Sequence, residues 1–527
     1  MCGIFCLVQT GAKIPDHLVK SCLLKLRPRG PDKSNLISIS LSNQIEISLG
    51  FTRLSVMDTT DAGLQPFVDG NIHVVCNGEI YNYQELASDD NIRMASSCDC
   101  EIILPIYRKY GFHQMLGQKL NGEFAMVLLD GLTLYAGRDR FGVRPLFFGH
   151  NKKLGIMGFA SEMKALDPIM EFVEQVPPNA YARMDLGHTF SASPEFVEYL
   201  TYGVERCMPI APLDQIHCQI RQLLTAAVKK RLQADRPIGF LLSGGLDSAL
   251  ITSIACRILG PDQMVCFTIG IPGSPDVSAA KTVTQFLGIK QHHVIDFSVE
   301  KGLDVLEEVI AAIESYDVTT IRASVPQYMM GQYIRTNTNI KVLLSGEGSD
   351  EIHGSYRYFR DAENPTEFHL ETQRLLRDLC FFDNLRTDRT MGSNGLEVRV
   401  PFLDFDYVKY ITELDPKLLM WKPGYMEKKI VRDSFQSYLP NEILYRPKEA
   451  FSDAVSSNEI NWAKSIQLHA ESVVNSSSST LPIDATYFKR IFDSIYPLRS
   501  NVIPYRWMPR FQKEVVTDPS ATVLKCY

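Results

Sequence analysis

The spacing of hydrophobic and polar positions divides the chain into two parts. Before about residue 190, short apolar runs are separated by turn residues, at 37–41, 73–76, 125–129 and 146–148. This pattern predicts a sheet-rich segment. One amphipathic helix is predicted over 100–110, because Ile103, Ile106 and Tyr110 fall on one face.

Beyond residue 200 the apolar period changes. Strands are predicted at 238–242, 265–269 and 341–344, and helices at 246–259, 279–287 and over 303–335. Strands that alternate with helices favour a parallel sheet wrapped by helices. The passage 176–213 is rich in proline and polar residues, as is typical of a join between domains. We therefore place one domain at 1–200 and a second at 201–527.

Composition and charge narrow the class of protein. The 527 residues are 45% hydrophobic and 22% charged, with a net charge of -7, so the chain offers no basic field for nucleic acid or an anionic membrane. The twelve cysteines are scattered, and Cys98 and Cys100 lack a second pair at zinc-ligand spacing. We expect free thiols, a cytoplasmic protein without a membrane segment, and small-molecule chemistry.

Two glycine-containing turns follow predicted strands. Ser243–Ser248 reads SGGLDS and opens a helix, and Ser345–Glu351 reads SGEGSDE. A glycine turn at a helix N-terminus suits a phosphate group, although such a turn can also serve packing alone. Both turns are expected at the same edge of the sheet, where open α/β folds bind ligands. No Walker lysine accompanies them.

The carboxylates of these turns suggest two kinds of chemistry. Asp247 and Asp350 carry oxygen ligands suited to Mg²⁺. Glu347 is then left for acid or base work on a substrate.

The chain opens with MCGIF. Removal of Met1 would leave Cys2 as the first residue, with its thiol and a free α-amine on one residue. That arrangement builds a nucleophile with its own base. The alternative is an ordinary small apolar residue near a chain end.

Taken together, these strings resemble the glutamine-hydrolysing asparagine synthetases. The likeness extends over practically the whole chain through YDVTTIRAS (316–324), GLEVRVPFLD (395–404), YRPKEAFSD (445–453) and WMPRF (507–511). The resemblance implies an α+β/α/β two-domain fold. The first domain is expected to be an Ntn-hydrolase-type αββα sandwich that acts as a glutamine amidotransferase. The second is expected to be a parallel-sheet α/β ATP pyrophosphatase domain with extra helices.

For the second domain the resemblance implies ATP cleavage between the α and β phosphates, with L-aspartate converted to β-aspartyl-AMP. The products are asparagine, AMP and pyrophosphate. The implied ATP-binding residues are Leu242, Ser243, Gly244, Gly245, Leu246, Asp247, Ser248, Ile269, Ser345 and Gly346. Asp247 and Asp350 would hold Mg²⁺, Glu347 would act on the attacking amine, and Lys448 would offset charge in the transition state. Arg322 and Arg399 are either substrate contacts or structural ion pairs.

For the first domain the resemblance implies release of ammonia from L-glutamine at Cys2, leaving glutamate. Asn77 and Gly78, in the string NGEIYN, would form the oxyanion hole, although NG alone also fits a hairpin turn. The implied glutamine-binding residues are Arg53, Leu54, Ser55, Val56, Met57, Asn77, Gly78, Glu79 and Asp99. Of these, Arg53 would hold the α-carboxylate and Asp99 the α-ammonium.

The chain departs from the family pattern at Pro28, which stands where the family commonly has histidine. The proline removes an imidazole and a backbone N–H near the glutamine pocket, with consequences for loop closure or coupling. Three readings stay open: asparagine synthesis, adenylation of another carboxylate as in the similar β-lactam synthetases, and a silent binding protein. Cys2 with Arg53, Asn77 and Asp99 argues against the β-lactam branch. Cys2, Asp247, Glu347 and Asp350 argue against a silent binding protein. A homodimer is expected from the family.

Overall fold

The computed structural model describes residues 1–527 except 12, 43–44, 188–193, 202–210, 448–455, 457–459, 475–480, 512–518 and 520–527. The chain forms two compact units, 1–201 with 233–236 and 392–397, and 202–232 with 237–391 and 398–527. Two short segments of the later sequence thus belong to the first unit. Among the described residues, no helix is long and apolar enough to cross a membrane.

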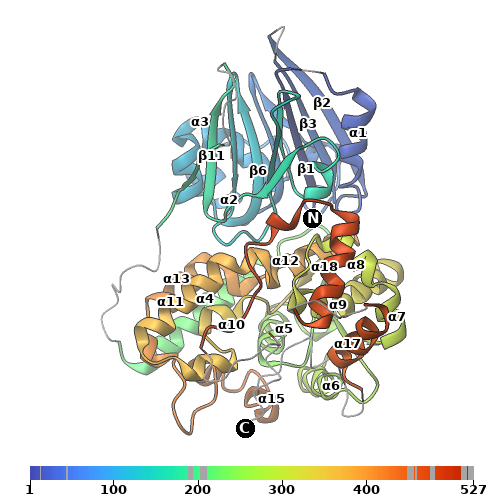
Figure 1. The fold of residues 1–527 in the computed structure, drawn as a ribbon. Helices are drawn as coiled ribbons and strands as arrows, with labels where there is room; N and C mark the ends of the chain where they lie inside the picture. The colour runs from blue at the N-terminus through green and yellow to red at the C-terminus, as the bar shows by residue number, and fades with distance from the viewer. Residues whose placement is uncertain are drawn as a thin grey trace. The chain divides into compact units, whose positions relative to one another are not determined.

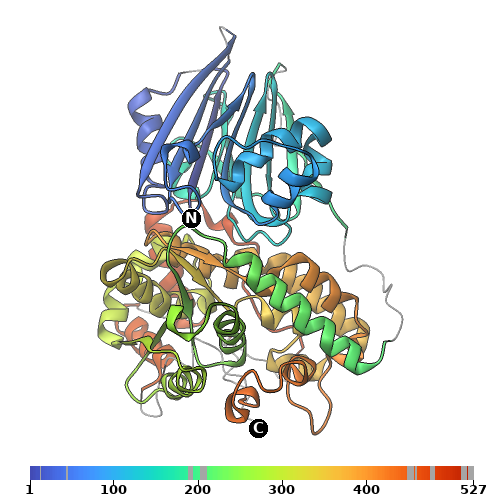
Figure 2. The same ribbon diagram turned by 180° about the vertical axis from the view of Figure 1, so that it is seen from behind.

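The first unit is built on two antiparallel sheets of six described strands each (Figures 1 and 2). One has the order β10-β8-β9-β1-β3-β2, with β1 Gly3–Gln9, β2 Lys33–Ser42, β3 Ile45–Arg53, β8 Phe147–Asn151, β9 Ile156–Ala160 and β10 Phe172–Gln175. The other has the order β12-β11-β7-β6-β5-β4, with β4 Phe67–Asp69, β5 Ile72–Ile80, β6 Gly122–Asp130, β7 Thr133–Arg138, β11 Ala180–Asp185 and β12 Phe196–Glu198.

Alternating side chains let each sheet contribute to two apolar layers. Ile4, Val8, Val75 and Val127 belong to one buried cluster between the sheets. On the outer faces lie α1 (Asp16–Leu24), which packs on β3, and α2 (Tyr83–Asp89) with α3 (Ile103–Gln114), which cover β5. This helix, sheet, sheet, helix layering is the αββα sandwich expected from the sequence.

The predicted helix over 100–110 is displaced in the structure. A 3₁₀ turn occupies Asp99–Ile102, and α3 continues to Gln114. The helix is kinked at Gly111, whose φ of 74° is not helical, and Phe112 beyond the kink is again buried. The turn at its start carries Asp99, which is therefore positioned by the beginning of a helix.

The second unit contains a five-stranded sheet of order β15-β14-β13-β16-β17. Its strands are β13 Ile238–Leu241, β14 Val265–Gly270, β15 Gln291–Asp296, β16 Val342–Leu344 and β17 Glu397–Arg399. Strand β13 pairs in parallel with both β14 and β16, and β14 pairs in parallel with β15. This confirms the predicted parallel sheet.

Helices surround this sheet, as the alternating pattern predicted (Figure 2). Those that contact the strands are α5 Leu246–Leu259, α6 Pro275–Leu287 and α9 Val318–Asn337, and α4 Leu213–Arg231 packs against α5. The others are α7 Val299–Asp304, α8 Leu306–Ile313, α10 Ser349–His353, α11 Pro365–Asp378, α12 Asp383–Gly392, α13 Phe405–Glu413, α14 Lys429–Ser434, α15 Asn441–Leu444, α17 Trp462–Val473 and α18 Ile483–Ile495. The stretch predicted as helical over 303–335 is three helices, α7 to α9.

Candidate active sites

The first glycine turn lies between β13 and α5. The Ser248 hydroxyl accepts a hydrogen bond from the Ser243 backbone N–H at 3.1 Å and lies 3.0 Å from the Ser243 hydroxyl. Gly244 has φ of 81°, and a Cβ there would lie 2.5 Å from the Asp276 carbonyl oxygen. Glycine is therefore required at this corner, and the loop is closed on itself by its two serines.

The second glycine turn lies beside the first, because β13 and β16 are neighbours in parallel register. A Cβ at Gly346 would lie only 2.7 Å from the Ser248 backbone nitrogen. The two turns therefore touch through a glycine at the carboxyl ends of adjacent strands. This is the edge of an open α/β sheet at which ligands bind.

A pocket of about 190 Å³ opens at this edge. It is lined by nine of the ten residues predicted to bind ATP: Leu242, Ser243, Gly245, Leu246, Asp247, Ser248, Ile269, Ser345 and Gly346. Gly244 does not line it and instead shapes the turn. Phe267, Ala323 and Met330 add apolar surface suited to a flat base, while the turns offer N–H groups and hydroxyls. That these residues bind ATP stays a prediction.

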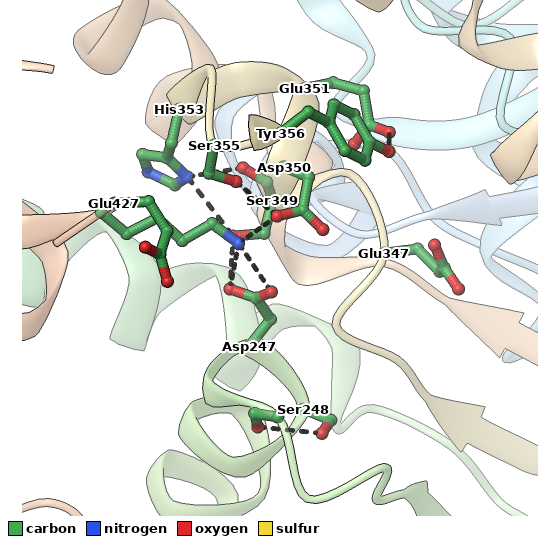
Figure 3. A network of polar contacts seen from close by, with 12 residues as sticks. Asp247, Ser248, Glu347, Ser349, Asp350, Glu351, His353, Ser355, Tyr356 and Glu427 are labelled. Carbon is green, nitrogen blue, oxygen red and sulfur yellow. Dashed lines mark hydrogen bonds and ion pairs between the residues drawn. The ribbon is translucent and has the colours of Figure 1, made fainter. Parts of the chain in front are cut away.

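The two predicted magnesium ligands converge on one point. Lys428 Nζ lies 2.7 and 2.6 Å from the two carboxylate oxygens of Asp247 and 2.6 Å from Asp350 Oδ1. Figure 3 shows the side chains of Asp247 and Asp350 close to each other. Ser349 donates a hydrogen bond to Asp247 Oδ1 at 2.7 Å, and Ser355 donates to Asp350. The carboxylates are therefore held ready for a cation.

Glu347, the candidate acid or base, lies on the pocket wall apart from this pair (Figure 3). Its Oε1 accepts a hydrogen bond from Arg386 Nη2 at 2.6 Å, and the same Nη2 lies 3.4 Å from Asp383 Oδ1. Arg386 and Asp383 lie on α12 and also line the pocket. The sequence pattern does not identify either residue, because nothing in FFDNLRTDRT marks them before the fold is known.

A second set of titratable groups lies on α10 and just after it. Burial, together with the carboxylates of Asp383 and Asp350, raises the pKa of Glu351 well above its usual range. Tyr356 donates a hydrogen bond to Glu351 Oε1 at 2.5 Å. Burial, with a smaller contribution from the Lys428 ammonium, lowers the pKa of His353 to about 4. Several groups with shifted pKa values thus lie at this edge of the sheet, as is typical of active sites.

Three other basic residues were predicted as candidates for contact with substrate or phosphate. Arg322 is buried and pairs with Asp484 at 2.5 Å, and Arg399 is buried and donates to the Arg231 carbonyl oxygen at 3.0 Å. Neither lines the pocket. For both, the structure favours the structural alternative. Lys448 lies outside the described residues, so its role stays a prediction.

In the first unit, Cys2 directly precedes β1. Its thiol donates to the Leu54 carbonyl oxygen at 3.7 Å, and burial raises the pKa of that thiol to about 12. Met1 is fully buried, and its amine lies 3.7 Å from Glu397. With Met1 in place, therefore, the thiol is protonated and the α-amine belongs to another residue.

The loop after β3 contains the predicted glutamine contacts Leu54, Ser55, Val56 and Met57. The buried Arg53 guanidinium donates to the Met57 carbonyl at 3.3 Å and also to the carbonyl oxygens of Asp58 and Thr60. The Ser55 backbone N–H donates to Asp32 Oδ2 at 2.8 Å. In this structure Arg53 shapes the loop, and contact with a glutamine carboxylate stays a prediction.

Asn77 and Gly78 are in β5, opposite β6. Asn77 is fully buried, and among the described residues neither atom of its side-chain amide has a hydrogen-bond partner. A Cβ at Gly78 would lie 2.0 Å from the Glu123 carbonyl oxygen, so only glycine fits between the strands. The strand assignment rules out the hairpin alternative for NG. A buried amide without a partner suits an oxyanion hole.

Asp99 lies close to these residues through β5. Its Oδ2 accepts the Ile80 backbone N–H at 2.5 Å, while Cys100 on the same turn donates to the Gly78 carbonyl at 3.3 Å. Asp58, which was not predicted from the sequence, accepts the Ser97 N–H at 3.0 Å. Asp58 thereby links the loop after Arg53 to the turn of Asp99. Glu79 is also buried, opposite Glu123.

Pro28 lies in a turn with its side chain exposed. The neighbouring Arg29 is buried, donates from Nε to the Cys2 carbonyl oxygen at 3.0 Å, and pairs with Glu162 at 2.7 Å. The contact with Cys2 is therefore made by Arg29. The effect of Pro28 on loop closure or coupling stays a prediction.

Comparisons with known proteins agree over the whole chain. Residues 1–209 match the family model described as "Glutamine amidotransferase domain", and 219–379 with 360–501 match "Asparagine synthase". A relative from Acanthamoeba polyphaga mimivirus, named "Probable asparagine synthetase [glutamine-hydrolyzing]", is 54% identical, covering 99% of this chain and 100% of the relative. The "Asparagine synthetase [glutamine-hydrolyzing]" proteins of Bos taurus and Homo sapiens are 38% and 37% identical, each covering 100% of this chain and 99% of the relative.

Proposed function

The chain belongs to the family of glutamine-hydrolysing asparagine synthetases, and we propose that it transfers the amide nitrogen of glutamine to the β-carboxylate of L-aspartate in an ATP-dependent reaction. The products are asparagine, glutamate, AMP and pyrophosphate. The observation that carries the proposal is the meeting of the two serine-glycine turns at one pocket, with Glu347 on its wall. Aspartate as the acceptor, Mg²⁺ as the metal and the role of each residue are parts of this proposal.

The glutamine half begins with removal of Met1. This converts the Cys2 amide nitrogen into an α-amine, which has an ordinary pKa of about 7.7–8.0 and takes the thiol proton. The sulfur then attacks the side-chain amide of glutamine. The oxyanion is stabilised by the Asn77 side-chain amide and the Gly78 backbone N–H, and ammonia leaves. Water finally releases glutamate from the thioester.

In the synthetase half, adenylation gives the aspartate carboxylate a leaving group. A β-carboxylate oxygen attacks the α-phosphorus of ATP, and the bond to the β-phosphate breaks. The turns 243–248 and 345–348 hold the phosphates through N–H groups and hydroxyls. Ammonia then attacks the acyl carbon and AMP departs. Glu347, held by Arg386, takes the proton that the attacking nitrogen must lose.

The residues present fit a magnesium ion. Oxygens of Asp247 and Asp350 already converge on a single cationic nitrogen within 2.7 Å. Within the described parts of the chain, no group of three or more histidine, cysteine or acidic side chains could hold a metal. Two carboxylates completed by phosphate oxygens and water are the usual surroundings of Mg²⁺ beside a nucleotide. When bound there, the ion would neutralise charge on the departing pyrophosphate.

Isotope transfer tests the acceptor and the bond that breaks. L-Aspartate labelled with ¹⁸O in both β-carboxylate oxygens should pass one label to AMP and keep the other in the asparagine amide. Mass spectrometry of AMP after one round of synthesis gives the answer. Label in pyrophosphate, or unlabelled AMP beside labelled asparagine, would contradict attack on the α-phosphorus. Formation of AMP only with another carboxylic acid would favour the alternative acceptor.

We also propose a cytoplasmic enzyme that forms a homodimer. All ten cysteines among the described residues are free, which supports the reducing compartment expected from the sequence. The homodimer rests on the family resemblance alone. Light scattering of the purified protein measures its mass directly.

A further inference from the structure

Lys428 occupies the place between the two predicted magnesium ligands. The residue immediately precedes α14, has φ of 56°, and is 4% exposed. Its Nζ contacts three oxygens from two separate turns, at 2.6–2.7 Å. This lysine is buried, has a strained backbone conformation and shares its charge between two carboxylates. The contact is therefore held in place by the fold and differs from a surface ion pair.

The ammonium and a magnesium ion cannot occupy this place together. Mg²⁺ binds oxygen ligands at about 2.0–2.1 Å and requires near-octahedral geometry. An ammonium at 2.6 Å from the same oxygens fills that space and repels a second cation. Without a metal, the lysine offsets the repulsion between Asp247 and Asp350. One of the two carboxylate charges is thus balanced by the protein itself.

When the nucleotide binds, its phosphates offer the lysine an alternative anionic partner. Lys428 lines the same pocket as Gly245 and Ser248 of the phosphate turn. Its flexible four-carbon side chain carries a compact charge that can move between nearby anions. The phosphates of ATP supply such an anion and carry their own magnesium ion. The two cations then have separate partners.

We propose that Lys428 is an internal counter-cation of the metal site: it partly neutralises Asp247 and Asp350 before substrate binds, and moves to the nucleotide phosphates when Mg²⁺ enters. This inference rests on the proposed function, because it takes Asp247 and Asp350 as metal ligands. The consequence is that metal and nucleotide bind together. A free divalent cation competes with the lysine for the two carboxylates. When the metal binds together with ATP, the phosphates of ATP become the new partner of the lysine.

The test compares binding of a metal alone with binding of the same metal beside a nucleotide. Mn²⁺ replaces Mg²⁺ because its binding is followed by electron paramagnetic resonance, and α,β-methylene-ATP cannot be cleaved at the relevant bond. In Lys428→Met the protein should bind Mn²⁺ alone about tenfold more tightly than wild type, and the Mn²⁺ nucleotide complex about tenfold more weakly. A simple structural role would weaken both or neither.

Lys429→Met is the matched control, since Lys429 is the next residue, is more exposed, and pairs with Asp433 at 2.7 Å. It should behave as wild type in both titrations. Lys428→Gln removes the charge but keeps hydrogen-bond donors, and it provides the same comparison should the methionine variant fail to fold. Unchanged or weaker binding of Mn²⁺ alone in the folded variant overturns the inference.

The same titrations separate this inference from the function on which it rests. Asp247→Asn should abolish tight binding of Mn²⁺ with the nucleotide if the proposed metal site is right. If it does so while Lys428 variants show no opposite changes, the counter-cation role fails alone. If wild type binds no Mn²⁺ with the nucleotide, the proposed metal site fails, and the inference fails with it.

Discussion

Arg386 donates a hydrogen bond to Glu347 at 2.6 Å, on the wall of the pocket formed by the two serine-glycine turns. The pair joins α12 to the turn after β16 and holds the Glu347 carboxylate in one orientation. Sequence spacing singled out Glu347, whereas only the fold brings Arg386 to it. A positioned carboxylate beside the reacting nitrogen is the feature that a proton acceptor needs.

Glu347→Gln should therefore lower asparagine synthesis by at least about 10²-fold, within the range of general acid–base catalysis. The amide keeps the size of the side chain and an oxygen for Arg386, so the fold is preserved. Glutamine hydrolysis without aspartate, measured as glutamate release, should be unaffected. Synthesis at the wild-type rate would remove Glu347 from the mechanism.

Substitution of Asn77 is expected to lower glutaminase activity without lowering the stability of the protein. Its buried amide has no partner among the described residues, so Asn77→Leu should leave the free energy of unfolding unchanged or raise it. Glutaminase kcat should nevertheless fall by about 10²- to 10³-fold, as for loss of one oxyanion donor. Denaturant unfolding and glutamate release measure the two effects.

Asn82 of the same string is the control for Asn77. It donates to the Lys119 carbonyl at 2.8 Å and accepts the Asn121 N–H at 3.0 Å. Asn82→Leu should therefore destabilise the protein by about 1–3 kcal/mol. An Asn77→Leu protein that loses as much stability would show that Asn77 is a structural amide.

His353 makes the stability depend on pH. Its Nδ1 lies 2.7 Å from the Ser349 carbonyl oxygen, so it carries the proton, and Tyr407 lies 3.1 Å from Nε2. Since burial lowers the pKa to about 4, the unfolded chain binds a proton between pH 6.5 and 4 that the folded chain does not. The stabilising contribution is complete above pH 6.5 and is lost as the pH falls towards 4.

Comparison of wild type with His353→Gln isolates this effect. As the pH falls from 7 to 4, the free energy of unfolding of wild type should decrease by up to about 3 kcal/mol more than that of His353→Gln. Parallel curves for His353→Gln and wild type would refute the neutral buried imidazole.

Arg322 and Asp484 should behave as a structural ion pair. Both side chains are 1% exposed and lie 2.5 Å apart. Arg322→Met alone should cost about 3–5 kcal/mol of stability, because it leaves a buried carboxylate without its cation. Arg322→Met with Asp484→Leu should recover most of that loss. A fully stable single variant with a raised KM for aspartate would instead make Arg322 a substrate contact.

The sequence predicted what depends on local pattern. The apolar periods located the two kinds of sheet, and helix α5 matches its predicted range 246–259 because both its apolar face and its glycine boundaries are local signals. The start of α6 at Pro275 was missed, although Ser274 and Pro275 form a recognisable N-terminal signal. The two glycine turns met as expected because parallel neighbours place their carboxyl ends together.

What was missed depends on contacts between distant residues. Lys428 stands in MEKKI, which has no feature of a binding motif, and only tertiary packing brings it to Asp247, 181 positions away. Residues 233–236 and 392–397 join the first unit for the same reason. The orphan amide of Asn77 likewise becomes visible only when its surroundings are known.

The most direct test of the account is asparagine formation by wild type and Cys2→Ala, with Mg²⁺, ATP and aspartate, and with either glutamine or ammonium as the nitrogen source. Wild type should form asparagine from both sources, with one pyrophosphate for each asparagine. Cys2→Ala should lose synthesis from glutamine and keep synthesis from ammonium. Equal loss of both, or wild-type synthesis from glutamine without Cys2, would contradict the division of the reaction between the two units.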